Sequence, residues 1–394
     1  MNDDCKTIYT KTGEPIKWIT RTADSYLDKT TLIFGGSGSG KTTIIEEILY
    51  LCNKYIPNYV VIAPKTSDKA YRNKNLPIRC IKEDLTKEKL QIIWKRQYNI
   101  TQMYNIANDV TILENLFNKA PDRQTFVMIQ AIIKRASDKT EEIQRNHILN
   151  FAQKKSQTSN VKELCAKKIK SLYKKSIRQN REILSSKSID GKLTDKEKVA
   201  LEYLDINPRL MIIIDDSTEK FQSWMKLFKK GEINPFESIF YKGRWNYITL
   251  LFAAHDDKII VPELRKNARI TYYTTSQSLM ASLNKAQSGF TTQEKKFAQR
   301  CAEVLFTDEE DGVKSWQKLC YVREDTSPWR YVIANLYPEF IIGSEPLHNL
   351  VNKMPKIEDG LNNNPYLKNI VTQKNKTTGR KSSKIFSSKN KKNY

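Results

Sequence analysis

The residues most able to do chemistry form a glycine-rich run near the start of the sequence. Gly35-Gly-Ser-Gly-Ser-Gly-Lys-Thr42 fits the pattern G-x-x-x-x-G-K-[ST] at every required position. The run stands between an apolar segment, residues 31–34, and a segment with apolar residues at helical spacing, residues 42–52. In such a loop the backbone N–H groups and a helix N-terminus face phosphate oxygens, and Lys41 reaches the β and γ oxygens. The pattern predicts a nucleoside triphosphate site.

The alternative is a loop that only turns a corner, which would leave Lys41 unpaired against a helix start. The residues predicted to bind ATP are Gly35, Gly36, Ser37, Gly38, Ser39, Gly40, Lys41, Thr42 and Thr43.

A second apolar segment, residues 210–214, ends in the acids expected beside such a loop. Asp215 and the Thr42 hydroxyl are the predicted ligands of Mg²⁺, and Asp216 is predicted to polarise the attacking water. Asp216 could instead cap the helix that follows. Glu219 remains a weaker candidate for the same catalytic role, because glutamate is common in that role and reaches one methylene farther than aspartate.

The pattern of strands and helices around these residues predicts an α/β fold. Residues 31–34 and 59–63 are apolar strands on either side of a helix, which is the order of a parallel βαβ unit. Apolar strands are predicted again at 247–254 and 269–275. Two further strands, 318–323 and 329–334, flank a turn-rich linker and predict a C-terminal β-hairpin.

A helical insertion is predicted to interrupt the sheet. Residues 81–207 have almost no glycine and carry apolar and charged residues at helical spacing. Residues 151–190 hold 11 Lys or Arg against 3 Asp or Glu, which indicates either a solvated helix face or a polyanion-binding surface. The expected organisation is an ATPase core in two parts, 1–80 and 208–350, the insertion 81–207, and a flexible basic tail, 351–394.

The charge balance indicates either a nucleic-acid partner or a basic proteome with a solvated lysine-rich surface. The 394 residues include 67 Lys and Arg against 44 Asp and Glu, a formal charge of +23 that attracts polyanions. Residues 368–394 add nine Lys or Arg and no acid. The six cysteines form no C-x-x-C pair, and no signal peptide or membrane-spanning apolar run is evident, so a soluble protein of a reducing compartment is expected.

The order of the motifs resembles the poxvirus-type genome-packaging ATPases of nucleocytoplasmic large DNA viruses, within the FtsK/HerA superfamily. The likeness covers roughly residues 10–80 and 205–345. Beyond the motifs above, it rests on three segments: Gly243-Arg-Trp-Asn246 with the strand that follows it, Pro262-Glu-Leu-Arg-Lys-Asn267, and the late hairpin around Cys320-Tyr-Val-Arg-Glu-Asp325.

The resemblance implies an ASCE-type P-loop NTPase that hydrolyses ATP with Mg²⁺. His255 stands where the family typically has a glutamine that senses the γ-phosphate, a departure that leaves open a histidine satisfied locally at a strand end. Gln277, expected on the next strand, is a less favoured substitute. Arg265 aligns with an arginine that completes the site or acts across a subunit interface, unless it is an ordinary surface arginine. Arg244 is a similar candidate with weaker support.

The resemblance also implies a biological setting. The chain would form a homo-oligomeric ring of five or six subunits around double-stranded DNA, bound without regard to sequence, in the viral factory or virion of an infected cell. Capsid or nuclease components are further possible partners. Three alternatives stay open: a cellular-type FtsK/HerA translocase or repair helicase, a P-loop nucleotide kinase, and a non-enzymatic module in which the nucleotide only organises a DNA-binding assembly.

Overall fold

The computed structural model describes residues 7–228, 232, 234–285, 288–306, 316–334, 337 and 339–353. The chain divides into two compact units, residues 1–342 and 343–394, and each is considered by itself. In the second unit the described element is α15 (Glu345–Lys353). The predicted basic tail from residue 354 onward lies outside the described residues, as do Cys5 and the side chain of Glu219. The five described cysteines are free thiols.

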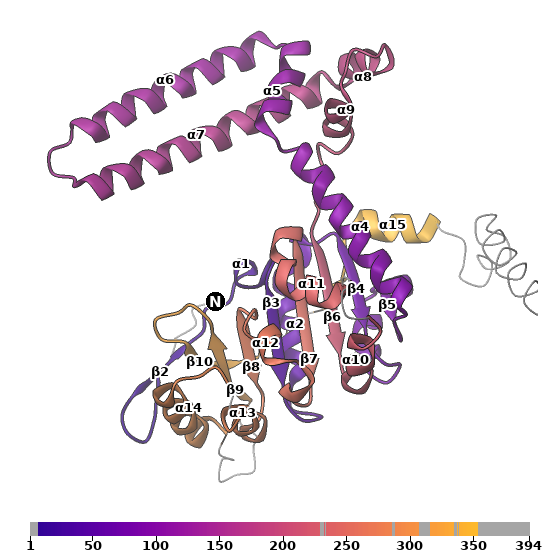
Figure 1. Cartoon of the computed structure of the whole chain (residues 1–394), viewed down its shortest axis with the longest axis vertical. Helices are drawn as coiled ribbons and strands as arrows, with labels where there is room; N and C mark the ends of the chain where they lie inside the picture. Colours follow the sequence, from indigo (N-terminus) through magenta and orange to yellow (C-terminus); the bar gives the residue numbers. More distant parts are fainter. Residues whose placement is uncertain are drawn as a thin grey trace, which may run out of the picture. The chain divides into compact units, whose positions relative to one another are not determined.

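One mixed sheet runs through the first unit (Figure 1). Within the described residues it has ten strands in the order β1-β2-β10-β9-β8-β3-β7-β6-β4-β5. The strands are β1 (Ile8–Tyr9), β2 (Pro15–Trp18), β3 (Thr30–Phe34), β4 (Asn58–Ile62), β5 (Ile81–Lys82), β6 (Leu210–Asp215), β7 (Ile248–Ala254), β8 (Ile270–Tyr273), β9 (Gln317–Val322) and β10 (Trp329–Ile333).

The six strands from β8 to β5 are parallel, and their carboxyl ends bring the glycine-rich run and the two acids to one edge of the sheet. β7 lies between β3 and β6, so the strand before the glycine-rich run and the strand before the two acids are next-but-one neighbours. The carboxyl ends of parallel strands meet at a common edge, where α/β proteins bind their ligands. The predicted fold class, a parallel-dominated sheet flanked by helices, is confirmed. The predicted hairpin is β9 and β10, which extends the sheet antiparallel to β8.

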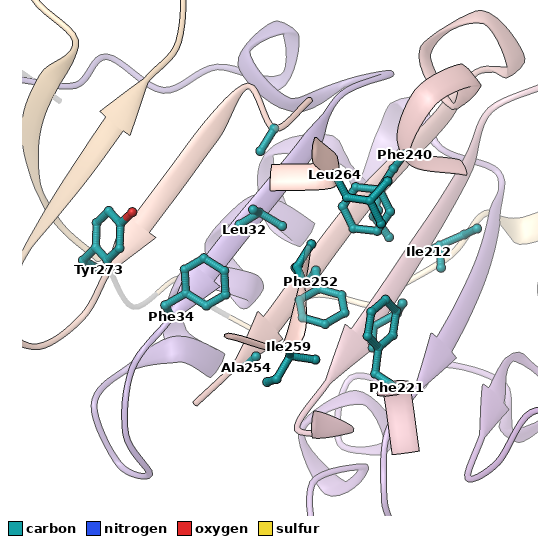
Figure 2. Packing of buried hydrophobic residues seen from close by; sticks show 14 of the residues in the cluster. Leu32, Phe34, Ile212, Phe221, Phe240, Phe252, Ala254, Ile259, Leu264 and Tyr273 are labelled. Carbon is teal, nitrogen blue, oxygen red and sulfur yellow. The ribbon is translucent and has the colours of Figure 1, made fainter. Parts of the chain in front are cut away.

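The central strands are buried on both faces, which explains their unbroken apolar runs. Figure 2 shows one of the two packed faces, where side chains of β3, β6 and β7 meet those of the helices after β6 and β7. The rings of Phe221 and Phe252 pack edge to face with their centroids 4.7 Å apart. This packing fixes the ends of β6 and β7, and with them the residues that follow each strand.

Short and medium helices connect the strands. They are α1 (Ala23–Tyr26), α2 (Lys41–Cys52), α3 (Lys69–Arg72), α10 (Thr218–Met225), α11 (Pro235–Lys242), α12 (Pro262–Arg265), α13 (Ser276–Leu283) and α14 (Thr292–Leu305), with single 3₁₀ turns η1 (Asn53–Tyr55), η2 (Ile78–Cys80), η3 (Arg244–Asn246) and η4 (Asp257–Ile259).

The segment predicted as a helical insertion is helical from residue 87 onward, while residues 81 and 82 belong to the sheet as β5. Its helices are α4 (Lys87–Ile106), α5 (Val110–Lys119), α6 (Arg123–Arg145), α7 (Phe151–Gln179), α8 (Arg181–Ile189) and α9 (Asp195–Glu202). α6 and α7 pack side by side as a long pair (Figure 1). Leu116, Tyr173 and Leu184 belong to an apolar cluster made by these helices themselves. The segment therefore has its own small core.

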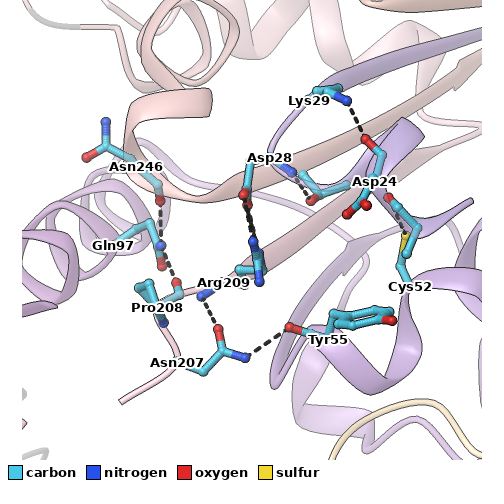
Figure 3. A network of polar contacts seen from close by, with 12 residues as sticks. Asp24, Asp28, Lys29, Cys52, Tyr55, Gln97, Asn207, Pro208, Arg209 and Asn246 are labelled. Carbon is cyan, nitrogen blue, oxygen red and sulfur yellow. Dashed lines mark hydrogen bonds and ion pairs between the residues drawn. The ribbon is translucent and has the colours of Figure 1, made fainter. Parts of the chain in front are cut away.

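A buried glutamine joins α4 to the sheet. The side chain of Gln97 donates to the carbonyl oxygens of Pro208 and Asn246, each at 2.7 Å (Figure 3). Those two carbonyls precede β6 and β7 respectively. Arg209 adds an ion pair with Asp28 just ahead of β3, at 3.2 Å. These contacts hold the beginnings of the three strands that carry the candidate site.

Candidate nucleotide-binding site

The glycine-rich run forms a tight loop between β3 and α2. Gly38 and Gly40 have φ angles of +70° and +87°, in the left-handed region that residues with a Cβ rarely adopt. Gly40 directly precedes Lys41, the first residue of α2. The backbone therefore turns sharply into the helix, so that the loop and the helix N-terminus face the same space, as a phosphate site requires.

The loop is fastened to the end of β8. A Cβ on Gly35 would lie 1.7 Å from Thr274 Oγ1, so only glycine fits at the first position of the motif. The Ser39 and Thr274 hydroxyls are 2.5 Å apart, and the Thr274 N–H donates to the Phe34 carbonyl at 2.9 Å. Thr274 was not expected at the site, because it lies more than 230 residues from the loop and carries no motif of its own.

Lys41 lies buried beneath the loop. Its Nζ donates to the carbonyl oxygens of Gly35 and Gly36, each at 2.8 Å. Burial lowers the pKa of Lys41, and the nearby carboxylates of Asp216 and Asp215 oppose that shift. The ammonium group thus sits between the loop and the acids, where it can bind oxygens of a phosphate chain.

Asp215 ends β6 in a buried position. Only 3% of its surface is exposed, and the hydroxyl of Tyr71 donates to its Oδ2 at 2.8 Å. Burial raises the pKa of Asp215, the Tyr71 hydrogen bond lowers it, and the neighbouring Asp216 raises it. Tyr71 comes from α3 and was not predicted as a site residue, because an isolated tyrosine in so short a helix carries no sequence signal.

Asp216 has a different environment from its neighbour. Its φ of +50° is left-handed, a conformation that aspartate tolerates better than most residues. His255 Nε2 lies 2.8 Å from one carboxylate oxygen, and the Ser67 hydroxyl donates to the other at 3.3 Å. The residue preceding α10 is Ser217, so Asp216 is not the helix cap that the alternative interpretation proposed. Strained backbone of this kind is common at functional sites.

Lys41, Asp215 and Asp216 line one pocket with a volume of about 340 Å³. Its lining residues are Ser37, Gly38, Gly40, Lys41, Thr42, Thr43, Ser67, Asp215, Asp216 and Trp316. The donor set fits a magnesium-bound triphosphate. Lys41 and the N-terminus of α2 can bind the phosphates, and the Thr42 hydroxyl and the Asp215 carboxylate can bind Mg²⁺, whose other ligands are usually water and phosphate oxygens. No cluster of three or more His, Cys, Asp or Glu side chains arranged to hold a metal occurs among the residues described.

Arg265 is held elsewhere. Its guanidinium pairs with Asp257, which also pairs with Lys285, and it is not among the residues that line the pocket. The arginine side chain is 14% exposed. A role for Arg265 in the reaction stays a prediction, and its observed contacts are those of a buried ion pair. Gln277 lies exposed in the first turn of α13, not on a strand as predicted.

Arg244 lies at the opposite ends of the strands. It lines a pocket of about 420 Å³ beside the first residues of β3 and the segments that precede β7 and β8. The other lining residues are Asp28, Lys29, Thr30, Phe240, Tyr241, Trp245, Lys266, Asn267, Ala268, Arg269, Arg323 and Glu324. Arg244 therefore does not share a pocket with Lys41 in the same chain.

No helix in the described part of the chain is long and apolar enough to cross a membrane.

No protein-family profile matches the chain. Among solved structures, the genome packaging NTPase B204 from Sulfolobus turreted icosahedral virus 2, in complex with ATP-gammaS, overlaps with a TM-score of 0.32 and 8% identity, covering 77% of this chain and 96% of that one. The pCW3 conjugation coupling protein TcpA overlaps with a TM-score of 0.36 and 12% identity, covering 89% of this chain and 70% of that one.

Sequence comparison gives relatives from one virus species. The B354L protein of African swine fever virus, from a Kenyan pig isolate, is 29% identical over 337 residues, which cover 80% of this chain and 84% of the relative. The same protein from a Namibian warthog isolate is 28% identical over 381 residues, covering 91% and 97%. Over most of its length the chain is therefore similar to a protein of a nucleocytoplasmic large DNA virus, the virus group whose packaging ATPases its motif order resembles.

Proposed function

We propose that this protein hydrolyses ATP to move double-stranded DNA, and that the DNA it moves is a viral genome being packaged. One observation supports the enzymatic part more than any other. Asp215, at the end of β6, and Asp216, which follows it, share a pocket with Lys41, and Asp216 is held by His255, which follows the neighbouring strand β7. A site that only bound a nucleotide would not need a second, exposed carboxylate beside the phosphates.

Each residue has a distinct task in this proposal. The loop N–H groups and Lys41 bind the β and γ phosphates, and Thr42 with Asp215 holds Mg²⁺. Bound Mg²⁺ neutralises negative charge that builds up on the phosphate oxygens. The Asp216 carboxylate accepts a hydrogen bond from the attacking water and aims it at the γ phosphorus. His255 and Ser67 hold that carboxylate in place from either side.

The DNA partner follows from charge and from the resemblance. A formal charge of +23 provides the sequence-independent attraction to phosphates that a translocase needs. Residues 151–190, most of which form α7, carry a large excess of Lys and Arg, and the tail adds more. The motif order implies a ring around DNA, and the viral relatives support genome packaging over a cellular role for such a motor.

The direct test measures Mg²⁺-dependent phosphate release with and without linear duplex DNA, together with the particle mass in the presence of ATP. We expect duplex DNA to raise the rate severalfold and the mass to be that of several subunits. Lys41→Ala should abolish turnover with or without DNA. A rate indifferent to DNA would contradict translocation, and transfer of the γ phosphate to a nucleotide acceptor would indicate the kinase alternative.

A further inference from the structure

The aromatic side chain of the nucleotide pocket has no role in the account above. Trp316 directly precedes β9 and lines the same pocket as Lys41 and Asp216. It is 55% exposed, so much of its indole surface is in contact with water. A single exposed tryptophan is unremarkable on a protein surface. Its position in a pocket that otherwise consists of glycine, hydroxyl and charged groups distinguishes it.

The order of strands fixes the side of the pocket on which Trp316 lies. β3, which leads into the loop, has β7 and β6 on one side and β8 and β9 on the other. Asp215 and Asp216 end β6, and Trp316 precedes β9, so the acids and the indole stand on opposite sides of the loop. The γ phosphate must lie at the acids for water to attack it. The rest of the nucleotide then extends across the loop toward the side of β9.

A buried lysine lies next to the indole of Trp316. Lys318, on β9, is 5% exposed, and its Nζ donates to the Thr274 carbonyl at 3.3 Å. The same ammonium lies 5.8 Å from the centre of a Trp316 ring, within cation–π range. A Cβ on Gly40 would lie 3.5 Å from Lys318 Cε, so the lysine also touches the loop. The loop and the indole are thus positioned by one side chain.

We propose that Trp316 stacks on the base of the bound nucleoside triphosphate. The proposal rests on the proposed function, because the acids define which end of the pocket receives the γ phosphate. The pocket residues that the structure describes include no Asn or Gln side chain to read the edge of a base. Stacking without edge recognition favours the larger purine rings over pyrimidines, and it discriminates little between adenine and guanine.

The test measures how much the base contributes to binding, separately from the phosphates. Dissociation constants are measured for Mg·ATP and for Mg·tripolyphosphate, which has no base, with the full chain carrying Trp316→Ala or Trp316→Phe. Trp316→Ala should weaken ATP binding by about tenfold, the size of one base–aromatic stacking interaction, and leave tripolyphosphate binding within about twofold. Trp316→Phe should keep most of the ATP affinity. GTP should behave like ATP, and the preference of the wild-type chain for ATP over CTP should shrink in Trp316→Ala.

Trp245→Ala is the matched control, because Trp245 is 76% exposed and lies in η3 at the opposite ends of the strands. It should change neither constant, and thermal unfolding should show that all variants fold. If Trp316→Ala lost as much affinity for tripolyphosphate as for ATP, or lost no affinity for ATP, the proposal would be overturned. Hydrolysis is not needed for these measurements. A chain that shows the base-specific loss but no DNA-stimulated turnover would support the stacking and contradict the proposed motor function.

Discussion

Asp215 and Asp216 follow each other in the chain but lie in different surroundings. Asp215 is buried and bonded to Tyr71, while Asp216 is partly exposed between His255 and Ser67. Two carboxylates with separate environments can take separate roles. The buried one is placed to hold a metal at a fixed position, and the exposed one can meet water.

The pH dependence of turnover should report the Asp215 carboxyl. Burial raises its pKa above the usual value of 3.8 for aspartate, and the Tyr71 hydrogen bond works against that rise. The metal-binding form is the carboxylate, so kcat/KM should fall as pH drops through this raised pKa. Tyr71→Phe removes a hydrogen bond that favours the charged form, so the pKa rises further and the acid limb should move to higher pH.

Tyr59→Phe is the control for that experiment. Tyr59 is also a buried tyrosine, but its hydroxyl donates to Asn53, at 3.0 Å. Its loss should leave the acid limb of kcat/KM where it is in the wild-type chain. An acid limb that stays fixed in Tyr71→Phe, or that moves to lower pH, would show that Asp215 does not set it.

At the residue scale, the sequence predicted the parts of the site that belong to motifs. Lys41, Asp215, Asp216 and His255 were expected and are brought together. Tyr71, Ser67, Thr274 and Trp316 were not expected, because each is a common residue type that reaches the site only through the folding of a distant segment. The buried ion pair between Arg265 and Asp257 could not be predicted from the sequence either, because a contact between a 3₁₀ turn and a short helix leaves no pattern in the sequence.

At the scale of elements, the strands were predictable because they are buried on both faces and therefore unbroken in their apolarity. β5 was not predicted, since two residues at a sheet edge carry too short a pattern, and the helical insertion therefore seemed to begin earlier than it does. The link between the insertion and the sheet was also hidden from the sequence. It depends on Gln97, one polar residue within a long amphipathic helix.

Removing that link should destabilise the sheet where β6 and β7 begin. Gln97→Ala removes the amide donor from the buried carbonyls of Pro208 and Asn246, and the Asn246 oxygen keeps only the longer hydrogen bond from the Thr101 hydroxyl, at 3.4 Å. This loss should lower the free energy of unfolding by about 1–3 kcal/mol. Gln91 is an exposed glutamine on the same helix, and Gln91→Ala should change the free energy of unfolding by no more than about 0.5 kcal/mol. Urea unfolding of both variants is the measurement. Equal stability of the two would show that the Gln97 hydrogen bonds do not couple α4 to the strands.

At the scale of the whole molecule, the excess of positive charge is predicted to bind DNA through phosphates. Deleting residues 368–394 removes nine Lys or Arg. We expect weaker binding of duplex DNA at low salt, with the basal ATPase rate unchanged. The slope of log affinity against log salt should also become shallower, by up to about 0.9 for each DNA phosphate that the tail no longer neutralises.

A full-length variant with those nine residues changed to glutamine controls for chain length. It should bind DNA as weakly as the deletion, because charge and not length carries the attraction. Binding titrations across a range of salt concentrations measure both effects. Unchanged DNA affinity in the deletion would show that residues 368–394 contribute nothing to DNA binding.

The most direct test of the account compares Asp216→Asn with the wild-type chain for both ATP binding and ATP hydrolysis. The amide keeps the size of the side chain but cannot take up the proton of an attacking water, so turnover should fall at least about a hundredfold while ATP affinity stays within about twofold. Asp138→Asn, an exposed position on α6, should change neither quantity. Turnover in Asp216→Asn close to that of the wild type, or a loss of ATP binding as large as that in Lys41→Ala, would contradict the proposed site.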